Sequence, residues 1–135
     1  MAATLPQLVS PLVVSLLIVA ACSLLREPNR QNFSAIFVAG AGAAYLSGGF
    51  GLWEFAFCAV VTGLAYFGLR HYWCIGLAWL LHTGWDALHH LYGNPIIPFL
   101  PDSSFGCAVA DLGLAAWYFL GAPSLYGRFA RSPAA

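Results

Sequence analysis

One nine-residue stretch carries most of the side chains that could do chemistry in this sequence. It spans residues 82–90 and reads HTGWDALHH. At 100° per residue on an α-helix, His82, Asp86 and His89 lie within about 60° of one another, and His90 lies about 40° beyond Asp86. The stretch therefore predicts one helix that presents up to four ligand-type side chains along a single stripe.

Two further acids lie inside neighbouring apolar segments. Glu54 is near the start of one segment, and Asp111 is about two turns into another. An ionised side chain at mid-bilayer costs about 2.5–3.5 kcal/mol on insertion scales. These acids, like Asp86, must therefore be protonated, hydrated, paired with histidinium or bound to a metal ion. We expect the three carboxylates to lie at a similar depth and to face one place.

The segments that must position these residues are apolar runs separated by turn signals. We expect an all-α fold, an integral membrane bundle of five transmembrane helices in a single domain over residues 1–135. Adjacent glycines at Gly48-Gly49 predict a turn between the second run and the third. The expected helices cover about 8–25, 33–48, 51–69, 72–92 and 104–121.

A four-helix count, with 33–69 as one kinked helix, is the competing topology, and charge placement favours five. With five crossings all the arginines fall on one side of the membrane, which the positive-inside rule makes cytoplasmic. The chain is then N-out and C-in, in a multi-pass arrangement in the inner (plasma) membrane. The arginines are Arg26, Arg30, Arg70, Arg128 and Arg131.

The amino-acid composition favours a membrane protein and argues against a nucleic-acid-binding protein. Hydrophobic residues make up 61% of the 135 residues and charged residues 7%, whereas soluble domains carry about 25% charged residues. Net charge is zero and no basic run exists, so nucleic acid is not an expected partner. Membrane lipid is the expected surrounding, with partner membrane subunits or a homo-oligomer as further possibilities.

The first apolar run contains Val19-Ala20-Ala21-Cys22, which looks like a lipoprotein cleavage site. No basic residue precedes the run and Arg26 follows it, which is the opposite of the charge order in a signal peptide. We therefore expect 8–25 to be a retained helix. All four cysteines lie in apolar segments without metal-type spacing, so we expect small buried hydrophobes. They are Cys22, Cys58, Cys74 and Cys107.

The loop 93–103 contains three prolines with apolar residues between them. It either folds back over the outer mouth of the bundle or forms a rigid connector at the interface. Asp102, Ser103 and Ser104 follow it and offer N-caps for the last helix.

The set of carboxylates and imidazoles suits a divalent metal, either zinc or iron and manganese. Heme fits less well, because three of the four histidines share one helix. The expected metal ligands are His82, Asp86, His89, His90, Glu54 and Asp111, and the expected acid–base groups are Glu54, Asp86 and Asp111.

The leading interpretation is a metal-dependent membrane enzyme that opens to the outer face and acts on a lipid-like or other apolar molecule. The first alternative is a non-enzymatic small subunit of a larger membrane complex that binds a metal, heme or pigment. The second is a proton-handling protein, which the absence of acids from the inner half disfavours. A purely structural polar network also remains open.

The C-terminal block resembles an uncharacterised family of small bacterial integral-membrane proteins, known only as a domain of unknown function. The resemblance covers mostly the last 45 residues and implies that this block is the working part of that family, without assigning an activity. The matching residues are His82, Trp85-Asp86, His89-His90, Gly93, Pro95-Ile96, Ser103-Ser104, Cys107, Asp111 and Gly121-Ala122-Pro123.

Two better-known families look similar more faintly. The spacings His82-x3-Asp86 and Asp86-x2-His89-His90 look like the histidine boxes of membrane desaturases and hydroxylases with aspartate substituted. Those enzymes bind two irons through about eight histidines, and this chain has four. Intramembrane zinc lipid hydrolases of the alkaline ceramidase type are similar in ligand types only.

Overall fold

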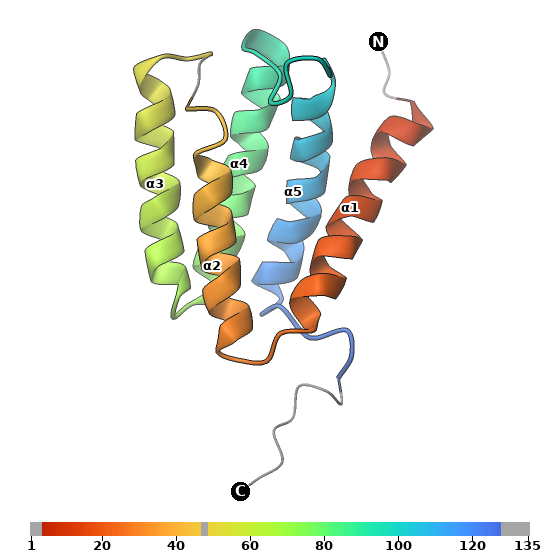
Figure 1. The fold of residues 1–135 in the computed structure, drawn as a ribbon, viewed down its shortest axis with the longest axis vertical. Helices are drawn as coiled ribbons and strands as arrows, with labels where there is room; N and C mark the ends of the chain where they lie inside the picture. Colours follow the sequence, from red (N-terminus) through yellow and green to blue (C-terminus); the bar gives the residue numbers. More distant parts are fainter. Residues whose placement is uncertain (1–3, 47–48, 128–135) are drawn as a thin grey trace, which may run out of the picture.

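The structure is a computed structural model that describes residues 4–46 and 49–127. It contains five α-helices in the described part of the chain, which confirms the all-α class and the number of helices (Figure 1). In chain order they are α1 Leu5–Ser23, α2 Asn29–Gly42, α3 Leu52–Gly68, α4 Tyr72–Tyr92 and α5 Ser103–Phe119.

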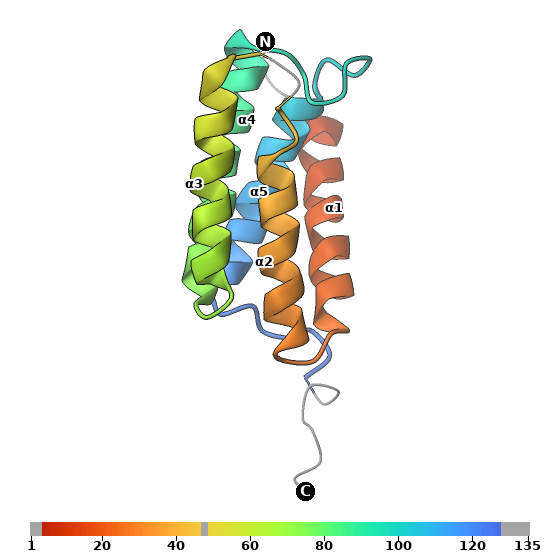
Figure 2. The ribbon, with the colours of Figure 1, turned by 60° about the vertical axis from the view of Figure 1, so that its left-hand side comes forward.

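Successive helices run in opposite directions, so the ends of the bundle differ in which termini they collect (Figures 1 and 2). The upper end in both views holds the N-termini of α1, α3 and α5 and the C-termini of α2 and α4. α4 contacts α2, α3 and α5, whereas α1 packs mainly on α5. The helix with the predicted stripe therefore contacts three other helices, as α2 also does.

The bounds of four helices agree with the predicted segments within three residues, and those of α4 agree at both ends. α2 differs, because it begins four residues earlier than the predicted 33–48 and ends six residues earlier. Pro28 stands at its N-cap, and the Asn32 N–H donates to the Pro28 carbonyl at 3.0 Å. Proline fixes φ without needing an N–H partner, which suits the start of a helix.

The last turn of α2 packs closely on α3. A Cβ on Gly42 would lie 2.7 Å from Cγ1 of Val61 on α3, so only glycine allows the two backbones this approach. After it, the Ala43 and Ala44 N–H groups bond three residues back. Gly49 and Gly51 then take φ values of +120° and +58°.

α2 and α3 are thus two helices, so the four-helix alternative is wrong. Gly48 of the predicted Gly48-Gly49 turn lies outside the described residues, as do Arg128 and Arg131.

The outer surface of the bundle is apolar on every helix. Large hydrophobic side chains that are 40% exposed or more occur on all five helices; examples are Leu16, Ile36, Phe55, Leu81 and Leu112. Within the described residues, α1 is the one helix that is both long enough and apolar enough to cross a membrane. The cysteines are free, with Cys22 and Cys74 buried and Cys58 and Cys107 half-buried.

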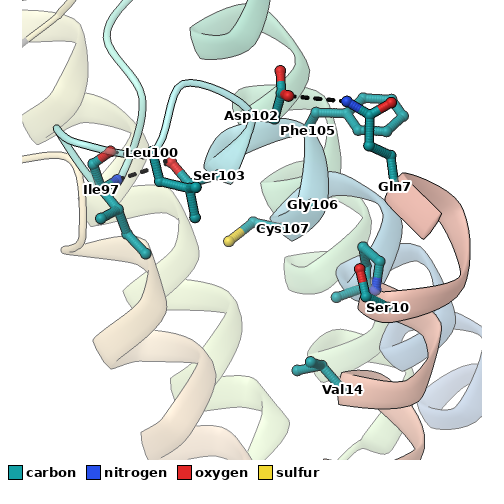
Figure 3. A pocket seen from close by; sticks show the side chains of 12 residues that line it. Gln7, Ser10, Val14, Ile97, Leu100, Asp102, Ser103, Phe105, Gly106 and Cys107 are labelled. Carbon is teal, nitrogen blue, oxygen red and sulfur yellow. Dashed lines mark hydrogen bonds between the residues drawn. The ribbon is translucent and has the colours of Figure 1, made fainter. Parts of the chain in front are cut away.

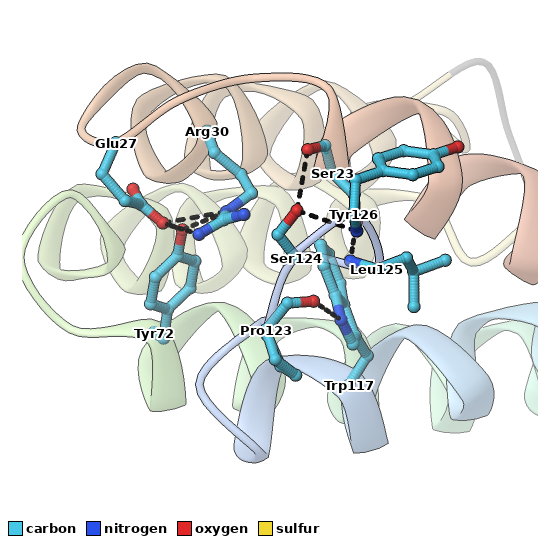
Figure 4. A network of polar contacts seen from close by, with 9 residues as sticks. All are labelled: Ser23, Glu27, Arg30, Tyr72, Trp117, Pro123, Ser124, Leu125 and Tyr126. Carbon is cyan, nitrogen blue, oxygen red and sulfur yellow. Dashed lines mark hydrogen bonds and ion pairs between the residues drawn. The ribbon is translucent and has the colours of Figure 1, made fainter. Parts of the chain in front are cut away.

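A polar network closes the lower end of the bundle (Figure 4). The Arg30 guanidinium forms an ion pair with Glu27, and the Tyr72 hydroxyl donates to the same carboxylate at 2.7 Å. The Ser124 hydroxyl donates to the Ser23 carbonyl at 3.1 Å, which fastens the segment after α5 to the end of α1. Arg30 and the first turn of α4 therefore lie at one end, away from the predicted site.

Candidate metal centre

His82 is the centre of the polar cluster in the upper half of the bundle, and it is 2% exposed. Its Nε2 lies 2.8 Å from the carbonyl oxygen of Ala41, near the end of α2. A carbonyl only accepts hydrogen bonds, so Nε2 must carry a hydrogen. The other ring nitrogen, Nδ1, faces two carboxylates, at 2.8 Å from Asp111 Oδ2 and 3.2 Å from Asp86 Oδ2.

Both carboxylates of this cluster are buried: Asp86 is 0% exposed and Asp111 6%. Asp86 comes from α4, one turn after His82, and Asp111 lies about two turns into α5. Oδ1 of Asp86 has no hydrogen-bond partner among the described residues. A buried carboxylate without donors costs far more than a paired one, so this cluster needs a positive species beside it.

The three side chains also meet the requirements of a metal site. One ligand atom from each of His82, Asp86 and Asp111 lies within 4.8 Å of the others, so this buried group could hold a metal ion. One imidazole nitrogen and two carboxylate oxygens are a donor set that suits zinc or iron and manganese. The bond from Nε2 to Ala41 is the outer-shell contact by which proteins fix the ring of a metal-binding histidine.

A second histidine–carboxylate pair lies near the upper end of the same helix. His89 Nε2 on α4 is 3.0 Å from Glu54 Oε1 on α3, an ion-pair distance without hydrogen-bond alignment. His89 Nδ1 lies 3.2 Å from the carbonyl oxygen of Asn94. Glu54 is held by two donors at 3.0 Å, the Phe50 N–H on Oε1 and the Trp85 indole N–H on Oε2.

Tyr45 lies between the cluster and the pair, although it is not among the predicted site residues. Its ring stacks on His89 at 3.7 Å between centroids and is 6.3 Å from the ring of His82. Its hydroxyl donates to Ser104 Oγ at 2.7 Å. Because α2 ends at Gly42, Tyr45 and the Ala41 carbonyl lie at the site. The predicted helix over 33–48 includes both residues within its length, so the sequence did not identify them as site residues.

The structure thus brings five of the six predicted site residues into one polar region in two groups, and it places His90 elsewhere. His90 is exposed, and its ring packs on Phe105 at 5.4 Å. It follows His89 directly and so points about 100° away from it around the helix. On the described geometry His90 therefore contributes no atom to the cluster, and its role as a ligand stays a prediction.

The predicted caps of the last helix need a correction. Asp102 is the N-cap residue of α5, but its side chain makes no capping hydrogen bond and accepts instead from the Gln7 amide at 2.9 Å. The hydroxyls of Ser103 and Ser104 accept from the Ile97 and Ile96 N–H groups, each at 3.0 Å. These serines fasten the loop, whose own backbone donors would otherwise lack partners.

The fastened loop turns back onto the start of α5 and borders an apolar groove of about 410 Å³ between α5 and α1 (Figure 3). Ile97 and Leu100 line it from the loop, and Val14 lines it from α1. Cys107 and Ala110 form part of its α5 wall, and Ala110 directly precedes Asp111. The groove therefore passes beside the helix that supplies one carboxylate of the cluster.

Comparison with known proteins places the chain in a family without giving it an activity. A family model described as a family of unknown function (DUF6010) matches residues 6–124. The chain therefore belongs to that family, and the match extends well beyond the C-terminal block. No curated protein matches. No solved structure matches either.

Proposed function

We propose that this member of the DUF6010 family is a multi-pass membrane protein that binds a divalent metal ion at His82, Asp86 and Asp111. We further propose that it uses the ion to act on a lipid or other apolar molecule at the outer side of the membrane. The observation that carries the proposal is the orientation of His82. Its one N–H is committed to Ala41, and its free nitrogen faces two buried carboxylates.

The metal part of the proposal rests on the count of donors and acceptors. With His82 neutral and both aspartates ionised, the three side chains offer only lone pairs to one another, and they repel unless a cation lies between them. Among the described residues, Asp86 and Asp111 form ion pairs with His82 and with no arginine. A metal ion supplies the missing charge and also accounts for the unpartnered Oδ1 of Asp86.

The membrane part of the proposal rests on the surface of the bundle. Soluble proteins rarely expose contiguous apolar patches above a few hundred Å², whereas this bundle exposes large apolar residues on all five helices. Arg30 and Glu27 lie at the opposite end from the cluster, as the positive-inside rule requires if the cluster is near the outer face. A lipid environment explains the apolar surface and the small charged fraction together.

For the chemistry, a bound ion would polarise an oxygen of the substrate or lower the pKa of a coordinated water. His82 and Asp86 would hold the ion from α4, and Asp111 would hold it from α5. The groove beside α5 supplies an apolar path of suitable size for a small molecule. Zinc would indicate hydrolytic chemistry and iron or manganese redox chemistry.

Elemental analysis of detergent-purified protein tests the proposal. We expect about one or two zinc, iron or manganese ions per chain, with the loss of at least one ion in His82→Ala. The conservative variant His82→Gln keeps a polar side chain of similar reach and should fold while losing the same ion. Metal-free wild type that is folded would contradict the proposal.

A structural clamp is the second candidate, because the geometry that faces Nδ1 towards two carboxylates also fits a protonated imidazole. An imidazolium donates through both nitrogens and neutralises one carboxylate. On this account the chain is a metal-free subunit or proton-handling protein. His82→Gln would then lower stability without changing metal content.

A further inference from the structure

We propose that the apolar groove between α1 and α5 binds a single-chain amphiphile with a positively charged amine head. The amine would lie at the Asp102 carboxylate, and the chain would extend between the two helices. The inference rests on the proposed function, since it takes this groove as the place where the apolar molecule binds. It goes further by naming the chemical class of that molecule.

The first ground is that the polar side chains lining the groove are already bonded within the protein, except for part of Asp102. The Ser10 hydroxyl donates to a backbone carbonyl one turn earlier at 2.8 Å, and Ser103 accepts from a loop N–H at 3.0 Å. The Gln7 amide donates to Oδ2 of Asp102 at 2.9 Å (Figure 3). The exposed Asp102 side chain makes no capping bond, so its other oxygen, Oδ1, is free for a donor on a ligand.

The second ground is the charge of that carboxylate. Asp102 begins α5 at the upper end of the bundle, whereas the arginines of the described residues lie at the lower end (Figure 1). His90 packs on Phe105 of the groove wall but does not itself line the groove. The carboxylate therefore attracts a cationic head and repels an anionic one. The described arginines are Arg26, Arg30 and Arg70.

The third ground is the shape of the groove. Its α5 wall runs from Asp102 to Ala110, eight residues later and so about 12 Å along the helix. The volume of about 410 Å³ is near the lower end of the range for small-molecule pockets, which suits one alkyl chain better than two. The exposed carboxylate stands at one end of this wall and the buried Ala110 at the other. A charged head and an apolar tail have the same order.

Photolabelling of the protein in phosphatidylcholine nanodiscs is the test. The probe is a dodecylamine that carries a diazirine on its chain, and mass spectrometry identifies the labelled peptides. We expect labels on the groove walls, within residues 7–14 and 97–110. Dodecylamine should displace the probe about five-fold more effectively than dodecanol, as an exposed ion pair allows, and dodecanoate should be the weakest competitor. Labels spread evenly over all five helices would indicate ordinary lipid contact and overturn the inference.

Substitutions separate the head from the chain. Asp102→Asn keeps an acceptor for the Gln7 amide and should remove the preference for the amine, whereas Glu27→Gln, at the lower end, should keep it. Val14→Trp, at a position 48% exposed, should fill the groove and weaken all three competitors alike. Leu16→Trp points about 200° away from Val14 around α1 and is the matched control. An unchanged preference in Asp102→Asn would contradict the amine head.

The failure of this inference and that of the proposed function are distinguishable, because the labelling does not require a metal. Each measurement is made on chelator-treated and on zinc-loaded protein. Bound zinc together with equal displacement by the amine and the alcohol would overturn the amine head and leave the proposed function standing. Selective displacement by the amine in protein that binds no metal would overturn the metal site and support the assignment of the groove.

Discussion

Both ends of the bundle hold charged side chains, but they balance the charge in different ways. At the lower end a permanent cation, Arg30, pairs with Glu27, and the Tyr72 hydroxyl donates a hydrogen bond to the same carboxylate (Figure 4). At the upper end three carboxylates face two imidazoles whose N–H groups are committed to backbone carbonyls. The lower network is neutral without a ligand, and the upper one lacks a cation.

The difference separates a structural network from a binding site on physical grounds. Glu27 is 44% exposed, so water screens the lower pair and its contribution to stability is small. The upper acids are nearly inaccessible, and leaving them without counter-charge would cost several kcal/mol. If the upper end served only to stabilise the fold, an arginine–carboxylate pair like that of Arg30 and Glu27 would suffice there. The upper end instead presents lone pairs from three helices to a common space.

The largest expected effect is that of metal removal on the upper end. Where the free ion exceeds its Kd about 1,000-fold, binding stabilises the fold by about 4 kcal/mol. A strong chelator should therefore lower the unfolding midpoint in detergent and speed amide exchange in the C-terminal half of α4. Exchange near Tyr72 should not change. Equal acceleration at both ends, or none, would remove the contrast between them.

The upper site can also be disturbed without changing a polar group. Gly42→Ala places a methyl group 2.7 Å from Val61 Cγ1 and should cost about 1–3 kcal/mol by overpacking. It should also weaken metal binding, because the neighbouring Ala41 carbonyl orients His82. Gly40→Ala is the control: nothing lies within 4 Å of its Cβ, so it should be neutral or stabilising by up to about 1 kcal/mol. Unchanged metal affinity in Gly42→Ala would argue against a role for the Ala41 contact.

A smaller effect is expected when the lower network is broken. Arg30→Gln removes the cation from Glu27 and should lower the free energy of unfolding by about 0.2–1 kcal/mol, because Glu27 is 44% exposed and the pair is screened by water. Metal content should remain that of the wild type, because no hydrogen bond or ion pair between described residues joins this network to His82. Thermal unfolding with elemental analysis checks both parts, and loss of metal would show that the ends are coupled.

The sequence predicted the helices well where the pattern is local. The apolar runs and the signals at Arg70-His71 and Gly93 gave the bounds of α4 at both ends. Its spacing predicted that His82, Asp86 and His89 share a buried face, and all three are buried. Helical periodicity is a property of a few neighbouring residues, so it can be read without the rest of the fold.

The sequence could not predict which acid would pair with which histidine, because that depends on the rotation and depth of α3 and α5 against α4. Asp111 reaches His82, and Glu54 reaches His89. The presence of Tyr45 and the Ala41 carbonyl at the site could not be predicted for a related reason. α2 ends at Gly42, which packs against Val61 of α3, and apolar patterning does not reveal such a tertiary contact.

The smallest expected effect concerns His90, which compares a ligand-type residue inside the upper site with one beside it. His90 is exposed and packs on Phe105, so His90→Ala should change stability by less than about 0.5 kcal/mol, as is usual for surface substitutions. Metal content should equal that of the wild type, whereas His82→Ala, about two turns earlier on the same helix, should lose an ion. The two variants remove the same chemical group from one helix, and they differ in whether the side chain faces the buried carboxylates. Equal losses of metal would mean that His90 turns towards the site when an ion is bound, and would restore it to the ligand set predicted from the sequence.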